Sequence, residues 1–93
     1  MFDYTKEELS DVINIFFESK NPLILKSFPA KEKKKYLTLI VISALFKQGI
    51  VYSEQDINHI LKSVFHDFVT LRRYLVDYQF LTRDTDGSRY IKK

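Results

Sequence analysis

Hydrophobic side chains near the start of the chain recur at helical spacing. One helix face would carry Leu9, Val12, Ile13 and Phe16. Thr5 and Glu8 have the Ser/Thr-x-x-Glu spacing of a capping box, which marks a helix start. The Asn21–Pro22 step ends the helix, because a residue before proline avoids the α region. The pattern predicts an N-terminal helix within residues 1–20, followed by an extended or irregular connector.

A second predicted helix is apolar on nearly every side. Its first turn has the sequence Lys-Glu-Lys-Lys-Lys and so carries four lysines. In the segment that follows, Tyr36–Phe46, the only polar residues are Thr38 and Ser43. Such a helix must be covered on more than one side. The first helix and the C-terminal half of the chain can cover it, and so can a dimer partner. Gly49 is placed to end the helix in the left-handed conformation.

The segments that follow are short and well delimited. Ile50–Tyr52 is β-branched and aromatic, which predicts a single strand. Ser53 is placed to cap a third helix, with Glu54 and Asp56 in its first turn. After a turn at residues 63–66, Asp67 can cap a fourth helix that runs to about residue 78.

The C-terminal segment predicts a β-hairpin. Phe80–Arg83 and Arg89–Lys92 flank a turn that contains Asp86-Gly87. With the lone strand beside the hairpin, the order of elements predicts a mainly α fold with a small antiparallel β wing (α+β). The expected architecture is a winged helix-turn-helix preceded by an extra N-terminal helix. Residues 1–93 are expected to form a single domain, with 28–93 as the winged-helix core.

The composition argues against a disulfide-bonded, thiolate metal-binding or membrane-spanning protein. The chain has no Cys, which excludes disulfides and thiolate metal sites and fits a reducing, cytoplasmic setting. The longest apolar run, Leu37–Phe46, is about half as long as a membrane span, and the start lacks the pattern of a signal peptide. We expect a cytoplasmic protein with no membrane partner. A net charge of +3 permits an anionic partner without requiring one.

Catalytic chemistry has little support. His59 and His66 fall on different predicted elements, and no Cys or carboxylate pair completes a metal site. The chain has no Gly-rich phosphate loop, no nucleophile elbow and no H-E-x-x-H motif. We expect no enzymatic activity, no metal and no cofactor.

The predicted fourth helix separates its two adjacent arginines. At about 100° per residue, the buried stripe comprises Phe68, Leu71, Leu75 and Tyr78. Arg72 falls at the margin of this stripe. We therefore expect it to form a structural ion pair with a carboxylate, and the candidate partners are Asp67, Asp77 and Asp56.

Arg73 falls on the opposite side of this helix, with Thr70, Tyr74 and His66. This is the surface that a recognition helix offers to the major groove, where a guanidinium can contact a guanine edge or a phosphate. We expect Arg73, Thr70 and His66 to contact DNA. A solvated arginine on an exposed face is the alternative interpretation.

Further cations are expected to contact phosphates. Lysines in the first turn of a helix oppose its macrodipole, at a cost of a few tenths of a kcal/mol each, which favours a use for the charge. The expected phosphate contacts are Lys31, Lys33, Lys34, Lys35, Arg89 and Lys92. Asp84 and Asp86 at the hairpin tip would repel the DNA backbone. The alternatives are a solvated helix start and edge-strand cations that discourage aggregation.

Several spaced motifs occur between Phe28 and the C-terminus. They are F-P-x-K-x-K-K at Phe28–Lys34, Y-S-E with Asn58, D-x-x-x-L-R-R at Asp67–Arg73, L-V-D at Leu75–Asp77, and Arg83 with Asp86, Gly87 and Tyr90. In these motifs the segment resembles the bacterial family catalogued as domain of unknown function 2087. The resemblance implies a winged-helix-like domain that occurs alone or attached to transcriptional regulators. It implies no catalytic residue, and structural roles for Asp67, Arg72 and Asp77.

These observations predict a DNA-binding winged helix-turn-helix protein, a bacterial transcriptional regulator whose partner is double-stranded DNA. If the protein is a homodimer, the first helix and the outer face of the second are the expected interface. The alternative function is a protein–protein interaction module on a winged-helix frame without DNA binding. The modest net charge and the acidic hairpin tip favour that alternative.

Overall fold

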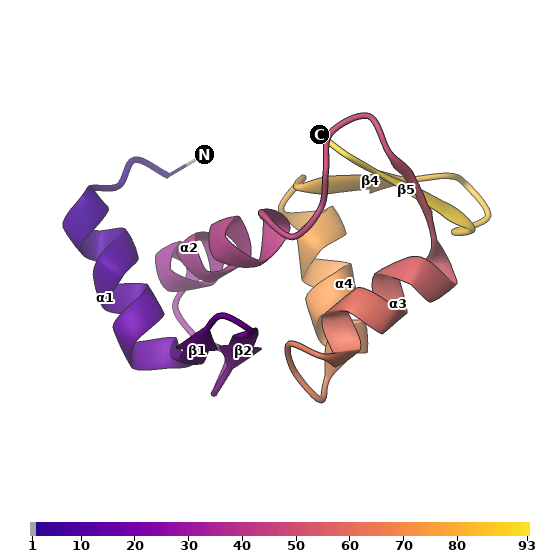
Figure 1. Cartoon of the computed structure of the whole chain (residues 1–93). Helices are drawn as coiled ribbons and strands as arrows, with labels where there is room; N and C mark the ends of the chain where they lie inside the picture. The colour runs from indigo at the N-terminus through magenta and orange to yellow at the C-terminus, as the bar shows by residue number, and fades with distance from the viewer. Residues whose placement is uncertain (1) are drawn as a thin grey trace.

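The computed structural model describes residues 2–93 (Figure 1). This part of the chain has an α+β fold with four helices and two small antiparallel sheets. In chain order, the elements are α1 (Lys6–Phe16), β1 (Phe17–Lys20), β2 (Leu23–Leu25), α2 (Glu32–Ser43), β3 (Val51–Ser53), α3 (Glu54–Lys62), α4 (Phe68–Asp77), β4 (Leu81–Arg83) and β5 (Arg89–Lys92). Figure 1 shows α1 and the β1–β2 hairpin at one end, and α3, α4 and the second sheet at the other. Helix α2 lies between the two ends.

Helix α1 begins as predicted but ends earlier. The Thr5 hydroxyl accepts the Glu8 N–H at 3.1 Å and the Glu8 carboxylate accepts the Thr5 N–H at 3.0 Å, which confirms the capping box. The helix ends at Phe16, because Phe17 adopts an extended conformation (φ −106°, ψ 137°).

Residues 17–25 form a two-stranded hairpin. The predicted helix is therefore wrong over residues 17–20, and the segment expected to be extended or irregular contains the extended strand β2. Strands β1 and β2 are antiparallel, and Asn21–Pro22 lies in their turn. Phe17 and Leu25 are partners across the hairpin and both are buried. The Leu25 N–H also donates to the Val64 carbonyl at 2.9 Å, which ties β2 to the turn between α3 and α4. Burial of Phe17 and Leu25 in the shared core therefore explains why these strands form.

Helix α2 is covered on two sides, as its composition predicts. It packs against α1 and α4, and its side chains Leu37, Leu39 and Ile42 are at most 2% exposed. The two buried polar side chains donate to carbonyls of the same helix, Thr38 to Lys34 at 2.8 Å and Ser43 to Ile40 at 2.8 Å. The helix ends at Ser43, three residues earlier than expected. Gly49 has the expected left-handed φ of +76°, but it lies in a later turn and does not cap α2.

The start of α3 and the start of α4 carry side-chain caps. Ser53 and Asp56 form a reciprocal capping box with hydrogen bonds of 3.0 and 3.1 Å. Asp67 caps α4 by accepting the Thr70 N–H at 3.3 Å. A turn at residues 63–67 joins the two helices, which pack against each other.

The second sheet places the lone strand beside the C-terminal hairpin, as expected. Its strand order is β3-β5-β4 and all pairs are antiparallel. Tyr90 of β5 lies opposite Tyr52 on one side and Arg83 on the other, and its side chain is fully buried. Gly87 in the hairpin turn has a φ of +73°, which favours glycine.

One continuous core joins the elements. Its buried hydrophobic residues are Val12, Phe17, Leu25, Leu37, Leu39, Ile42, Phe46, Ile57, Leu61, Val64, Leu71, Leu75, Leu81 and Tyr90. Within residues 2–93, no helix has both the length and the hydrophobicity that crossing a membrane demands.

Candidate nucleic-acid interface

The two adjacent arginines of α4 lie in different environments. Arg73 is exposed, whereas the Arg72 side chain is only 17% exposed. Arg72 donates from Nη1 to the Asn58 side-chain oxygen at 2.5 Å, and its Nη2 lies 3.7 Å from the Glu54 carboxylate. Both partners belong to α3. Arg72 therefore links the two helices through an ion pair and a hydrogen bond.

The ion pair of Arg72 is not with any of the three expected carboxylates. Because α4 packs against α3, the guanidinium reaches Glu54 rather than Asp67, Asp77 or Asp56. Asp67 instead accepts hydrogen bonds from the Thr70 hydroxyl at 2.7 Å and the Thr70 N–H, which lower the pKa of its carboxyl group. Asp56 belongs to the cap of α3.

A cleft of about 440 Å³ opens between α4 and the β4–β5 hairpin. Its lining consists of Val69, Arg72, Arg73, Val76, Asp77, Arg83 and Tyr90. We call it the arginine cleft. Behind it, the Tyr90 hydroxyl donates to the same Glu54 carboxylate at 3.2 Å, so Glu54, Arg72 and Tyr90 form one connected network.

Two arginines of this cleft have no partner among the residues that the structure describes. Within residues 2–93, the guanidinium groups of Arg73 and Arg83 make no hydrogen bond and no ion pair. The other two arginines of the sequence, Arg72 and Arg89, are paired with Glu54 and Asp84. The two unpaired arginines are thus brought together from α4 and β4.

Thr70 and His66 lie away from the arginine cleft. Thr70 lines a smaller hollow of about 220 Å³ on another side of Arg73, together with Tyr74 and Asp77. His66 is exposed in the turn that precedes α4, and its ring centroid lies 4.4 Å from that of Phe65. Of the three side chains expected to contact DNA from the fourth helix, Arg73 alone lines the cleft.

The lysines at the start of α2 are partly engaged inside the molecule. Lys33 lies 2.7 Å from the Glu8 carboxylate, and this contact is the main cause of the lowered pKa of Glu8. Lys35 lies 3.7 Å from Glu32 and also 5.0 Å from the centre of the Tyr74 ring. Lys31 and Lys34 are exposed and form no ion pair among the described residues. Lys31 is the N-cap residue of α2, and its side chain makes no capping hydrogen bond. The start of α2 therefore lacks the stabilisation that a capping side chain supplies.

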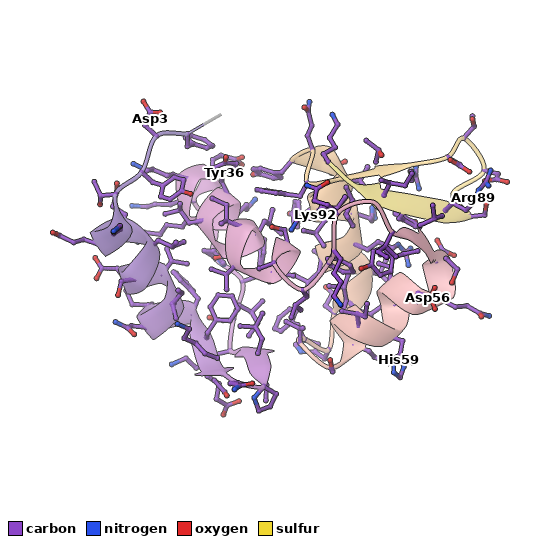
Figure 2. The ribbon with its side chains drawn as sticks, turned by 45° about the horizontal axis from the view of Figure 1, so that its top comes forward. Asp3, Tyr36, Asp56, His59, Arg89 and Lys92 are labelled. Carbon is purple, nitrogen blue, oxygen red and sulfur yellow. The ribbon has the colours of Figure 1, made fainter. Side chains whose placement is uncertain are left out.

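Two cations of β5, Arg89 and Lys92, are also engaged. Figure 2 shows Arg89 near the tip of the hairpin and Lys92 towards the middle of the molecule. Arg89 lies 2.7 Å from Asp84, and Lys92 donates to the Phe46 carbonyl at 3.0 Å. At the tip, Asp86 accepts the Ser88 hydroxyl and N–H, which lower the pKa of its carboxyl group. The Asp86 carboxyl group therefore favours the ionised form.

Two tyrosines of α4 and its C-cap have roles that the sequence did not indicate. Tyr74, expected on the exposed face, is partly covered and stacks on Phe28 with ring centroids 5.1 Å apart and planes 7° apart. Tyr78 donates its hydroxyl hydrogen to the Glu32 carboxylate. Burial and this acceptor raise the pKa of Tyr78 to about 12. These contacts attach the start of α2 and the preceding segment to α4.

The face expected to form a homodimer interface contains a groove of about 400 Å³ between α1 and α2. Its apolar lining comes from Val12, Ile15, Phe16 and Leu37, and Ile15 is 54% exposed. Acidic side chains of α1 and the lysines of α2 border it. The homodimer through this face stays a prediction.

The chain belongs to a bacterial family of uncharacterized conserved proteins, DUF2087, whose model matches residues 24–92. The match begins within β2 and ends in β5, so α1 and β1 lie outside it. Arg72, Arg73 and Arg83 all lie within the matched segment. No curated protein and no solved structure matches the chain.

Proposed function

We propose that the chain is a winged helix-turn-helix protein that binds double-stranded DNA, as a bacterial transcriptional regulator does. In this proposal α3 and α4 are the helix-turn-helix, α4 enters the major groove, and the β4–β5 hairpin is the wing. The pairing of β3 with the hairpin and the short turn between α3 and α4 support this assignment. The observation that carries the proposal is the pair of unpartnered arginines, Arg73 on α4 and Arg83 on the hairpin.

The remaining expected contacts divide into two groups. Within residues 2–93, Lys31 and Lys34 are exposed and form no ion pair, so their charges are available to phosphates. Lys34 Nζ lies 6.0 Å from the centre of the Phe16 ring. In contrast, Lys33, Lys35, Arg89 and Lys92 would first have to exchange an internal partner for a phosphate. In the proposed complex, Thr70 and His66 would lie beside the major groove that α4 enters. We therefore assign the main contribution to the two arginines and the two unpaired lysines.

A protein–protein interaction module is the alternative function, and one observation favours it. Val51 and Ile91 are cross-strand partners in the second sheet, and they are 54% and 42% exposed. Ile50 beside them is 44% exposed. Exposed apolar side chains that adjoin one another are typical of a surface that contacts a partner protein. This surface lies on β3 and β5, away from the residues that line the arginine cleft.

Fluorescence anisotropy with a labelled random duplex, titrated with salt, tests the proposal. We expect binding at about 50 mM salt and a log–log salt slope of about −3 to −4, which corresponds to roughly three or four neutralised phosphates. Arg73→Ala should weaken binding about tenfold, a loss within the range of one good contact. Lys6→Ala is the matched control, because it removes the same charge from an exposed position on α1, at the other end of the molecule. Absence of binding at low salt, or equal losses in the two variants, would contradict DNA binding through α4.

A further inference from the structure

We propose that the arginine cleft holds a single phosphodiester of the DNA backbone between the guanidinium groups of Arg73 and Arg83. This inference rests on the proposed function and specifies one contact of it. Arg73 then positions α4 on the backbone and does not read a base. Arg83, which lies in the wing, holds the same phosphate from the other side.

The charges around the cleft favour an anion. Arginine stays protonated at every physiological pH, so Arg73 and Arg83 cannot relieve their repulsion by losing a proton. Arg72 contributes little free positive charge, because Glu54 neutralises it. Asp77 lines the cleft but pairs with neither arginine within residues 2–93. An anion placed between the two guanidinium groups would therefore satisfy charges that the chain leaves without a partner.

The wall behind the two arginines is held in place. Tyr90 is fully buried and donates to Glu54, and Arg72 contacts both Glu54 and Asn58. These contacts join β5, α3 and α4. They fix the distance between the helix that carries Arg73 and the hairpin that carries Arg83. A contact between a helix and a hairpin held in this way is preorganised, which reduces the entropy lost on binding.

A phosphodiester matches the charge and the hydrogen-bond donors of the two guanidinium groups in the cleft. It carries one negative charge and has two non-bridging oxygens, and the guanidinium group offers a planar fork of N–H donors to such oxygens. Both arginines are exposed, so the cleft is accessible from the surface. Two donors from separate elements can each take one oxygen of the same group.

This placement is also compatible with the acidic tip of the hairpin. Arg83 ends β4, before the turn that carries Asp84 and Asp86. Asp84 is paired with Arg89, and Asp86 is hydrogen bonded to Ser88. A phosphate between Arg73 and Arg83 engages the hairpin through the Arg83 guanidinium, whose Nη1 lies close to Gly87 in the turn, and not through Asp84 or Asp86. The carboxylates can then stay in solvent beside the duplex.

A double-variant comparison tests the inference. The variants are Arg73→Ala, Arg83→Ala and the two combined, each titrated with salt against an AT-rich and a GC-rich duplex. If one phosphate is shared, the combined variant should lose clearly less affinity than the product of the two single losses, because the two arginines act on one group. Its salt slope should become shallower by about 0.9, the value for one phosphate, and not by about 1.8. Each loss should be the same factor on both duplexes, because a phosphate contact carries no sequence information.

The outcomes separate the two proposals. Absence of wild-type binding to either duplex would overturn both the DNA-binding function and the phosphate contact. Wild-type binding that Arg83→Ala leaves unchanged would overturn the shared phosphate alone, and so would independent losses with a slope change of about 1.8. A loss for Arg73→Ala that is confined to the GC-rich duplex would show that Arg73 reads guanine. Because neither arginine has a partner within residues 2–93, the thermal midpoints of all three variants should match that of the wild type within about 2 °C.

Discussion

The start of α2 and the arginine cleft are both basic, but they hold their charges differently. Four lysines fall within five residues at the start of α2, and two of them are paired with carboxylates of α1 or of α2 itself. The unpaired arginines of the cleft are ten residues apart in the chain. The dense cluster is thus partly neutralised, and the separated pair is not. Density of charge along a sequence does not measure how much of that charge is available to a partner.

The difference arises from what packs beside each region. Helix α1 lies against α2 and brings Glu8 to Lys33. At the cleft, the chain reverses direction after α4 through Gln79, which has a φ of +66°, and β4 then carries Arg83 back to the side of the helix. Glu54, which lies behind this site, is engaged by Arg72 and Tyr90. Asp77 lines the site but pairs with neither Arg73 nor Arg83 within residues 2–93. In the described part of the chain, the two exposed arginines, Arg73 and Arg83, are left without an acceptor.

The largest expected effect on stability is at the wall of the arginine cleft. Arg72→Ala removes a partly buried charged hydrogen bond to Asn58 and the contact with Glu54, and should lower the free energy of unfolding by about 2 kcal/mol. For a chain of this length, the thermal midpoint should fall by roughly 10 °C. Differential scanning calorimetry measures this shift. Arg73→Ala is the matched control and should leave the midpoint nearly unchanged; equal shifts would refute the separation of the two arginines.

A smaller effect is expected at the start of α2, where the N-cap lacks a side-chain hydrogen bond. Lys31→Ser supplies an N-cap hydroxyl and should raise the free energy of unfolding by about 1 kcal/mol. Urea denaturation measures the gain. Lys31→Gln removes the same charge without a good cap, so it should give clearly less. If the two variants gained equally, relief of the macrodipole and not capping would be the cause.

The smallest effect concerns Tyr78, which joins the two regions through its hydrogen bond to Glu32. Near neutral pH, Tyr78→Phe should cost about 0.5 kcal/mol, because the bond is exposed to solvent. The pKa of Tyr78 is raised in the folded protein from 10.0 to about 12. The stability that this hydroxyl contributes is therefore fully present below about pH 10 and is lost as the pH rises towards about 12.

The test is the difference in unfolding free energy between the wild type and Tyr78→Phe, measured by urea denaturation from pH 8 to pH 12. The difference should shrink above about pH 10, where the wild type loses the advantage of its protonated hydroxyl. Tyr4→Phe, at an exposed position before α1, is the control and should run parallel to the wild type. A difference for Tyr78→Phe that stays constant across this range would exclude the raised pKa as a source of stability.

Elements specified by neighbouring residues were predictable. The capping box of Thr5 and Glu8 and the caps at Ser53 and Asp67 each involve residues three apart, so their hydrogen bonds depend on local spacing alone. The turn at Gly87 follows from the same kind of short-range signal. The β1–β2 hairpin was missed because its strands are short and are stabilised by the burial of Phe17 and Leu25 in a core built by other elements.

For the candidate site, the sequence predicted the side of α4 on which each arginine lies, but not the partner of Arg72. Helical periodicity alone separates Arg72 from Arg73, because it sets which side of α4 each occupies. The partner of Arg72 depends on how α3 packs against α4, and spacing along α4 does not encode it. For the same reason, the sequence offered Asp67, Asp77 and Asp56 as partners, and only the packing of α3 against α4 selects Glu54.

By itself, then, the sequence determined where the helices begin, which of their faces are buried, and that a hairpin ends the chain. Those properties depend on interactions between residues a few positions apart. Only the tertiary structure decided which charges are neutralised and which remain without a partner. That outcome depends on the approach of segments distant in sequence, Glu8 to Lys33 and Arg73 to Arg83 among them, and such approaches follow from packing around the common core.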